Sequence, residues 1–308
     1  MRILFMGTPE FASNCLAAIY ESGEEIVGVV TTPDKPKGRG MVLTPSDVKK
    51  YALEKGLMVY QPLTLKDGAF LPVLEELQPE LIVVVAYGKI LPQYVLDYPK
   101  YACINAHASI LPTYRGAAPI QRAIIDGHSE TGVSIMKMDI GLDTGDVMLV
   151  EKVDIEENDN FEAVHDKLAV AGQKGLLRAI ELFKKGEATF TPQGENFTYA
   201  EKITKADCVI DFNKDVKEVH NRIRGLSPIP VAFTKTPDGK ILKVTVAHMS
   251  PVDYSGSVGQ VVHLDKSIYV KCANGTIALD RVVPEGKGQM AASDFINGRK
   301  IAVGDILG

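Results

Sequence analysis

The sequence lacks any long apolar run. The longest such run covers residues 81–87, whereas a helix that spans a membrane needs about 20 apolar residues. The first seven residues are apolar apart from one arginine, and no small-residue cleavage site follows them. They predict a buried strand and not a secretory signal. We therefore expect no association with a membrane.

Cysteine is also scarce, and the four cysteines form no C-x-x-C pair. Disulfide frameworks are typical of small secreted domains that cannot build a sufficient core. A chain of 308 residues with 45% apolar residues has no such need. The sequence therefore predicts reduced thiols and a cytoplasmic protein.

Motifs for nucleotide and metal binding are missing. The turn after the first predicted strand, Gly7-Thr8-Pro9, lacks the G-x-G-x-x-G spacing, and no Walker sequence follows any strand. The six histidines show neither H-x-x-x-H nor H-E-x-x-H spacing. These absences argue against a nicotinamide or ATP enzyme, and we expect no metal.

Positive charge is in short supply, with 34 basic against 39 acidic residues and a net charge of −5. This balance argues against a protein that coats nucleic acid without sequence preference, because such binding depends on the attraction of Lys and Arg to phosphate. Residues 1–206 carry 21 basic and 28 acidic side chains, and residues 207–308 carry 13 and 11. The difference, −7 against +2, permits a C-terminal half that faces RNA, although chance variation explains it equally well.

The first half of the chain alternates apolar strands with helical stretches, which predicts an α/β, Rossmann-like domain with a mostly parallel sheet. Residues 187–206 are polar and irregular. Beyond them, a short helix and several short strands separated by Gly and Pro predict a small β-barrel or sandwich. We therefore divide the chain into a first domain (1–187), a linker (188–206) and a C-terminal domain (207–308).

Asn105 and His107 are the strongest candidates for chemistry. Side chains alternate along a strand, so these two lie on one face, at the end of a strand where ligands bind in open α/β sheets. A histidine alone is as often a core residue. The Gly-bounded acidic turn at 141–146 changes that balance, because Asp143 could bring a carboxylate to the imidazole.

These three groups suit acyl transfer. When an amine attacks a formyl carbon, negative charge builds on the oxygen, and donors placed there stabilise it. Asn105 could donate its amide N–H. His107, with Asp143 behind it, could donate as an imidazolium or accept the proton of the amine. The sequence leaves both roles open.

The segments at 105–122, 131–133 and 141–146 resemble the signature of the 10-formyltetrahydrofolate-dependent formyltransferases. The resemblance covers nearly the whole chain, from the segment at 6–12 to a C-terminal domain that follows the segment at 199–203. It implies that Asn105, His107 and Asp143 are catalytic, that 10-formyltetrahydrofolate is the formyl donor, and that the second domain is an OB-like β-barrel. It also implies that the folate lies along two segments, which contain Ser109, Ile110, Leu111 and Pro112, and Ala86, Tyr87, Gly88 and Ile90.

Within this family, the chain is most similar to enzymes that formylate methionine on initiator tRNA for translation initiation. The resemblance implies a monomer with initiator methionyl-tRNA as its partner. The basic loop at 33–40 is then expected to order on RNA, although most charged loops are only solvated. The expected tRNA contacts are Lys35, Lys37 and Arg39 in that loop, and Arg222, Arg224 and Lys243 in the C-terminal domain.

Two alternatives remain at this point. A formyltransferase acting on a small amine, such as an amino sugar nucleotide or glycinamide ribonucleotide, would share the same three catalytic residues. The basic loop and the C-terminal domain argue against it. A folate-binding or RNA-binding protein without catalysis would not need Asn105, His107 and Asp143 together.

Overall fold

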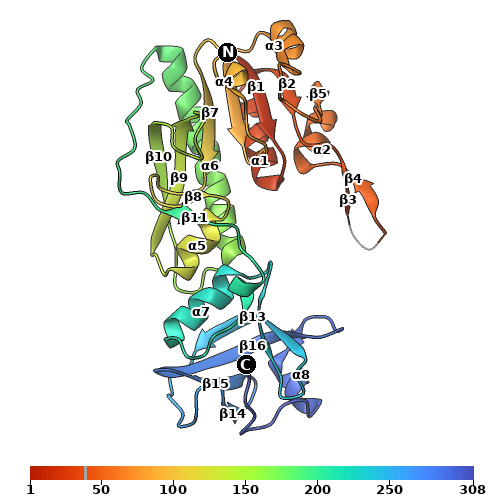
Figure 1. Cartoon of the computed structure of the whole chain (residues 1–308), viewed down its shortest axis with the longest axis vertical. Coiled ribbons are helices and arrows are strands. Elements are labelled where there is room, and N and C mark those ends of the chain that lie inside the picture. The colour runs from red at the N-terminus through yellow and green to blue at the C-terminus, as the bar shows by residue number, and fades with distance from the viewer. Residues whose placement is uncertain (38–39) are drawn as a thin grey trace. The chain divides into compact units, whose positions relative to one another are not determined.

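The computed structural model describes residues 1–37 and 40–308, and of Lys37 only the backbone. The chain divides into two compact units (Figure 1). Unit 1 comprises Met1–Gly116, Thr131–Val153 and His165–Tyr199, and unit 2 comprises Ala117–Glu130, Asp154–Val164 and Ala200–Gly308. Arg39, one of the predicted tRNA contacts, lies outside the described residues.

Unit 1 is built on a seven-stranded sheet with the order β10-β9-β7-β6-β1-β2-β5. Its strands are β1 (Arg2–Gly7), β2 (Glu25–Val30), β5 (Val59–Tyr60), β6 (Leu81–Val85), β7 (Ala102–His107), β9 (Glu130–Lys137) and β10 (Val147–Asp154). The pairs from β5 through β2, β1 and β6 to β7 are parallel, and β7 pairs with β9 antiparallel. The predicted α/β architecture with a mostly parallel sheet is confirmed.

The central strands are apolar throughout because both faces of this sheet are covered. All five residues of β6 are buried, as are five of the six in β1. The helices associated with this sheet are α1 (Glu10–Glu21), α2 (Asp47–Glu54), α3 (Leu71–Leu77), α4 (Gln93–Leu96) and α6 (Phe161–Lys185). Ser46 is the N-cap residue of helix α2, and its hydroxyl accepts the N–H of Lys49 at 3.0 Å.

Three pairs of segments complete the local structure around this sheet. Strands β3 (Lys35–Lys37) and β4 (Val42–Thr44) form an antiparallel pair. The short strands β8 (Arg115–Gly116) and β11 (Tyr199–Ala200) form a second two-stranded sheet. Thr191 also exchanges both backbone hydrogen bonds with Val147, so part of the predicted linker packs on unit 1.

Unit 2 contains an antiparallel sheet with the order β12-β13-β16-β15-β14, and β17 pairs with β16. The strands are β12 (Ala232–Lys235), β13 (Ile241–Met249), β14 (Val261–Leu264), β15 (Ile268–Cys272), β16 (Gly275–Pro284) and β17 (Met290–Ala291). The helices are α5 (Pro119–Ile125), α7 (Val216–Gly225) and α8 (Ala292–Asn297), with a 3₁₀ turn at Ala206–Cys208. The C-terminal β domain predicted from the sequence is confirmed, and its sheet is antiparallel.

Residues 117–130 and 154–164 belong to unit 2, although the sequence placed them in the first domain. Residues 154–164 accept hydrogen bonds from Arg224 of α7. For residues 117–130 the reason is the close packing of α5 on α7. A Cβ atom at Gly225 would lie 2.9 Å from Ile125 and 3.2 Å from Ile124, so glycine permits this approach. The division into a catalytic domain (1–187), a linker (188–206) and a C-terminal domain (207–308) stays a prediction.

All four cysteines are buried and unpaired. Burial raises the pKa of the Cys15 thiol to about 12.

In the described parts of the chain, no helix has both the length and the apolar character needed to cross a membrane.

The carboxylate of Asp207 joins two segments of unit 2 through hydrogen bonds. We expect it to make the free energy of unfolding depend on pH in the acidic range. Its carboxylate accepts from Thr204 N–H and Oγ1 at 2.8 and 2.7 Å and from Arg122 Nη1 at 3.0 Å. The hydrogen bonds from Thr204, followed by the one from Arg122, lower the pKa of Asp207 to about 2. Because the folded pKa lies below the unfolded value of about 3.9, the stabilisation is present above pH 4 and is lost as the pH falls towards 2.

The prediction is tested with Asp207→Asn. Urea unfolding at pH 7 should give a lower free energy of unfolding than wild type, and this difference should shrink as the pH falls from 4 to 2. The exposed Asp294 gives a matched control in Asp294→Asn. A difference from wild type that stays constant over this pH range would contradict the expected role of Asp207.

Candidate active site

The candidate site lies at the carboxyl end of β7, in the interior of the unit 1 sheet. In β7, Asn105 is level with Val84 of β6 and Met136 of β9, and His107 is level with Ser134 of β9. His107 is buried, with 6% of its surface exposed. The neighbouring strands on both sides therefore hold the backbone of these residues, as rigid catalytic placement requires.

The structure brings His107 and Asp143 together. Nδ1 of His107 lies 3.5 Å from Oδ2 of Asp143, and Nε2 lies 2.9 Å from the carbonyl oxygen of Tyr114. Both side chains are shielded, with 7% and 16% of their surfaces exposed. Both ring nitrogens thus face oxygen atoms that can only accept. A neutral imidazole has one N–H and can donate to one of them, whereas an imidazolium could donate to both.

The loop that carries Asp143 is held from several directions. Oδ2 of Asp143 accepts the backbone N–H of Gly116 at 2.8 Å, and the residue has a left-handed φ of 53°. Asp139 Oδ1 accepts from Gly141 N–H and Thr144 Oγ1 at 2.9 and 2.6 Å. At Gly145 the chain passes so close to the carbonyl oxygen of Lys137 that a Cβ atom would collide with it.

The side-chain amide of Asn105 is half-buried and has no hydrogen-bond partner among the residues that the structure describes. Its N–H groups are therefore free to bind a substrate oxygen. Across residues 1–37 and 40–308, no group of three or more His, Cys, Asp or Glu is placed to hold a metal ion. The arrangement offers an amide donor, an imidazole and a carboxylate, which is the set that acyl transfer needs.

Gln193 contacts the Asp143 loop and Arg115 contacts Gln193, and neither residue was predicted from the sequence to belong to the site. Gln193 donates from Nε2 to the carbonyl oxygens of Asp143 and Gly145 at 2.9 and 2.7 Å. Its Oε1 accepts from Nε and Nη2 of Arg115 at 3.0 and 2.7 Å. Gln193 lies in an irregular segment without periodicity, so no local signal in the sequence marks it.

The first predicted folate segment follows β7 directly. Ser109 is fully buried and donates to Thr113 O at 2.6 Å. The hydroxyl of Ser134 in β9 accepts the N–H of Leu111 at 3.0 Å and donates to Ser109 O at 2.7 Å. Ile110 and Pro112 are half-buried. This segment is therefore fixed to the sheet beside His107.

The second predicted folate segment follows β6, the neighbour of β7. Ala86 and Gly88 have left-handed φ angles of 45° and 81° and are exposed. Tyr87 between them is buried, and its hydroxyl has no hydrogen-bond partner among residues 1–37 and 40–308. Burial raises the pKa of this hydroxyl to about 12. Ile90 is 87% exposed. Backbone groups and an apolar side chain are thus available to a ligand at this edge of the sheet.

The predicted tRNA contacts differ in their surroundings. Lys35 in β3 and Lys243 in β13 are exposed, and Arg222 is half-buried with Nη1 donating to Asp207 O at 2.6 Å. Arg224 is only 8% exposed. It donates to Asn221 Oδ1 at 2.9 Å and to backbone oxygens in the segment at 154–164. These contacts occupy Arg224 within unit 2, so its position does not support the predicted contact with tRNA.

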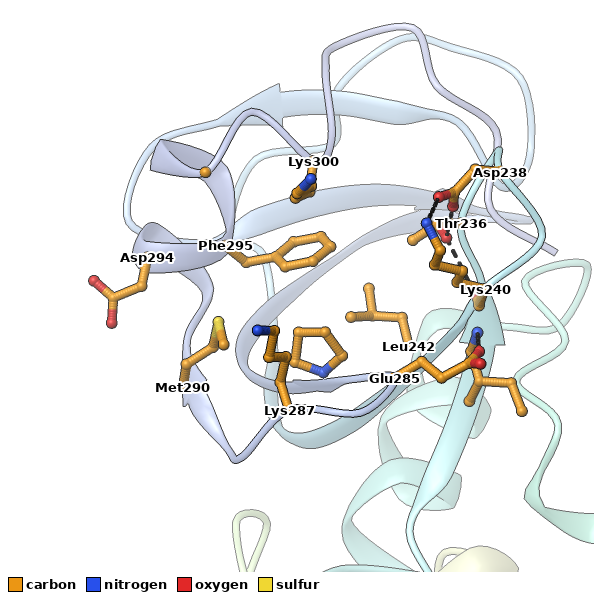
Figure 2. A pocket seen from close by; sticks show the side chains of 13 residues that line it. Thr236, Asp238, Lys240, Leu242, Glu285, Lys287, Met290, Asp294, Phe295 and Lys300 are labelled. Atoms are coloured by element: carbon orange, nitrogen blue, oxygen red, sulfur yellow. Dashed lines mark hydrogen bonds and ion pairs between the residues drawn. The ribbon is translucent and has the colours of Figure 1, made fainter.

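Unit 2 contains a cavity of about 420 Å³ between the start of β13, the end of β16 and α8. Figure 2 shows the ring of Phe295 and the side chain of Leu242 in its middle, with Lys300, Lys240 and Lys287 around them. Lys240 is paired with Asp238. None of the predicted catalytic or folate-binding residues lines this cavity.

Comparisons with known proteins agree with this architecture over the full length. The family model described as "Formyl transferase" matches residues 1–180, and "Formyl transferase, C-terminal domain" matches residues 202–300. The methionyl-tRNA formyltransferase of Geotalea uraniireducens is 42% identical over 310 residues, which cover 100% of this chain and 98% of the relative. That of Syntrophus aciditrophicus is 45% identical over 308 residues, with 99% and 98% covered.

Among solved structures, the N-formyltransferase of Helicobacter canadensis in complex with folinic acid and dTDP-3-aminofucose has a TM-score of 0.68. It is 19% identical to this chain, and the match covers 90% of this chain and 98% of the other. At this identity the likeness shows the fold alone. Family models and full-length relatives together show that the chain belongs to the formyl transferase family, with methionyl-tRNA formyltransferases as its full-length relatives.

Proposed function

We propose that this enzyme transfers the formyl group of 10-formyltetrahydrofolate to the amino group of methionine carried by initiator tRNA. The product is N-formylmethionyl-tRNA, which serves in translation initiation. The observation that carries the proposal is the contact of His107 Nδ1 with Asp143 Oδ2 at 3.5 Å, two residues beyond Asn105 at the end of β7. The full-length relatives named methionyl-tRNA formyltransferase support the choice of acceptor.

The reaction begins when the lone pair of the methionine amine attacks the formyl carbon. The C–N bond forms, and negative charge collects on the formyl oxygen. Asn105 donates its free amide N–H to this oxygen. Collapse of the tetrahedral intermediate breaks the bond to N10 of the folate, and one proton passes overall from the amine to N10. Donors already in place cost no reorganisation when the charge develops, which is why they accelerate the step.

His107 acts in this proposal as an imidazolium that stabilises the developing charge. Its Nε2 is hydrogen-bonded to Tyr114 O, and its Nδ1 lies 3.5 Å from Asp143 Oδ2, so a carboxylate faces the ring and stabilises positive charge on it. Accepting the amine proton would require one of these contacts to break. Asp143 orients the ring and balances its charge in a shielded site, where electrostatic interactions are stronger than in water.

The folate donor is proposed to bind along Ser109, Ile110, Leu111 and Pro112 and along Ala86, Tyr87, Gly88 and Ile90. Apolar walls with a few placed polar groups suit a pterin. The exposed backbone at Ala86 and Gly88 and the exposed side chain of Ile90 support this placement. Ser134 supports it indirectly, because it holds Ser109 and Leu111 to β9.

For the tRNA we propose Lys35, Lys37 and Arg39 in the basic loop, with Lys243 and Arg222 in unit 2, and we omit Arg224. Lys and Arg position a nucleic acid through its phosphates. Lys35 and Lys243 are exposed and available for such contacts. The protein is proposed to act as a monomer in the cytoplasm.

Formyl transfer is tested directly with the purified protein, 10-formyltetrahydrofolate and methionine-charged initiator tRNA. Uncharged tRNA and free methionine serve as controls, and an amino sugar nucleotide is offered as a rival acceptor. We expect formylation of the charged tRNA alone. Transfer to the amino sugar nucleotide without transfer to tRNA would establish the small-amine alternative, and folate binding without any transfer would exclude both proposals.

Arg39→Ala is expected to impair the use of tRNA and to spare the folate. We expect the KM for methionyl-tRNA to rise about tenfold and the KM for the folate to stay constant. The slope of the logarithm of tRNA affinity against the logarithm of salt concentration should become shallower by about one. Steady-state kinetics at several salt concentrations measure all three quantities. Lys66→Ala removes a cation that is exposed in the structure and serves as the control. An equal rise in both KM values would contradict a specific tRNA contact.

A further inference from the structure

We infer that Gln193 and Arg115 are positioning residues that hold Asp143 against His107 during formyl transfer. This inference rests on the proposed function and adds two residues to it. Neither residue reaches His107 through a hydrogen bond of its own. Both act through the loop that carries Asp143.

Gln193 binds the Asp143 loop at two points on its backbone. Its Nε2 donates to the carbonyl oxygens of Asp143 and Gly145 at 2.9 and 2.7 Å. One amide group therefore clamps the loop on both sides of Thr144. Asp143 has a left-handed φ of 53°, a conformation that is uncommon for residues other than glycine, and the two bonds from Gln193 hold the backbone in it.

Arg115 fixes the other end of the same amide. Nε and Nη2 of Arg115 donate to Gln193 Oε1 at 3.0 and 2.7 Å. Because the amide oxygen receives both bonds, the amide nitrogen of Gln193 must face the loop, so its orientation is determined. Arg115 is itself 6% exposed, and its guanidinium lies 4.5 Å from the centre of the Phe197 ring.

In the described parts of the chain, the guanidinium of Arg115 donates to the amide oxygen of Gln193 and not to a carboxylate. A buried arginine is ordinarily paired with a carboxylate, so its position here needs another reason. Arg115 also directly precedes Gly116, whose N–H binds Asp143 Oδ2 at 2.8 Å. The segment at 115–116 thus supports Asp143 twice, through Gln193 to its backbone and through Gly116 to its carboxylate.

This arrangement predicts an effect on the rate and not on substrate binding. A catalytic group displaced by about 1 Å can lose about 100-fold in rate. We expect Gln193→Ala to lower kcat about 10- to 100-fold, with less than a threefold change in the KM for either substrate. Asn196→Ala, in the same segment at an exposed position, should leave kcat unchanged.

Gln193→Glu separates positioning from general stability. Glutamate keeps an acceptor for Arg115 and adds a charge to that pair, but it places an oxygen opposite the carbonyls of Asp143 and Gly145. We expect its melting temperature to stay near that of wild type while kcat falls as in Gln193→Ala. A Gln193→Glu enzyme with wild-type kcat would overturn the inference, because the two bonds to the loop would then be dispensable.

Combination with Asp143→Ala gives a second test. If Gln193 acts through Asp143, Gln193→Ala should add less than a twofold loss to an enzyme that already lacks the carboxylate. A further 10-fold loss in the double variant would overturn the inference.

Wild-type enzyme is assayed beside each variant. Absence of transfer by wild type would defeat the proposed function, whereas active wild type with an equally active Gln193→Ala variant would defeat only the positioning role.

Discussion

Replacing His107 with alanine is expected to lower the rate of formyl transfer by about a thousandfold. His107 is buried at the end of β7, and no other ionisable ring is expected to replace its charge beside the formyl oxygen. Loss of a positioned acid–base group or of a preorganised charge each costs about 10²–10⁴ in rate. Single-turnover measurements with saturating enzyme and both substrates would report this loss without a contribution from product release.

Two further variants show whether the loss comes from the chemistry of His107. His107→Gln keeps an N–H that can donate to Tyr114 O but cannot carry a positive charge, so we expect nearly the same loss. His248→Ala removes a half-exposed histidine paired with Asp280 in unit 2 and should leave the rate unchanged. A His107→Ala enzyme that retains more than a tenth of the wild-type rate would exclude a catalytic role for this ring.

Replacing Asp143 with asparagine is expected to lower kcat about a hundredfold. Asparagine has nearly the same shape, and its Oδ1 can accept the N–H of Gly116 that now binds Oδ2 at 2.8 Å. It carries no negative charge to face His107 Nδ1, 3.5 Å away. The imidazolium would lose its counter-charge in a shielded site, where such a loss is expensive. Steady-state kinetics of wild type and variant, with both substrates at saturating concentrations, measure this effect.

The loss should come from the charge that is removed. A carboxylate close to an imidazole stabilises positive charge on the ring, so kcat should fall in Asp143→Asn while the KM for either substrate changes little. Asp146→Asn is the matched control, because the carboxylate of Asp146 lies in the same loop and makes no hydrogen bond or ion pair within the described residues. An Asp143→Asn enzyme with the kcat of wild type would contradict the proposed pairing.

The candidate site could be located from the sequence because its parts follow local rules. Alternation along a strand places Asn105 and His107 on one face, and the observed strand β7 ends at His107. The glycines around Asp143 indicated a tight turn, and the observed loop does return so closely to Lys137 that only glycine fits at position 145. The contact between these two segments could only be suggested, since it depends on how β7 and β9 pair.

The surroundings of the arginines could not be predicted in the same way. Arg222 and Arg224 lie two residues apart in one helix and look alike in the sequence. In the structure Arg224 is 8% exposed and donates to the segment at 154–164, whereas Arg222 is half-buried. Burial depends on which other segments pack on that face of α7, and those segments lie about 65 residues away in the chain.

By itself, the sequence determined the alternation of strands and helices in the first part, the mostly parallel sheet, the β-rich C-terminal part, and the residues that could carry acyl transfer, because periodicity, turns and strand alternation act over a few residues. Only the tertiary structure decided which distant residues complete the site. Gln193 meets Asp143 across 50 positions of the chain, and residues 117–130 join the C-terminal segment through packing of α5 on α7. Such contacts depend on the shape of packed surfaces, which no local pattern encodes.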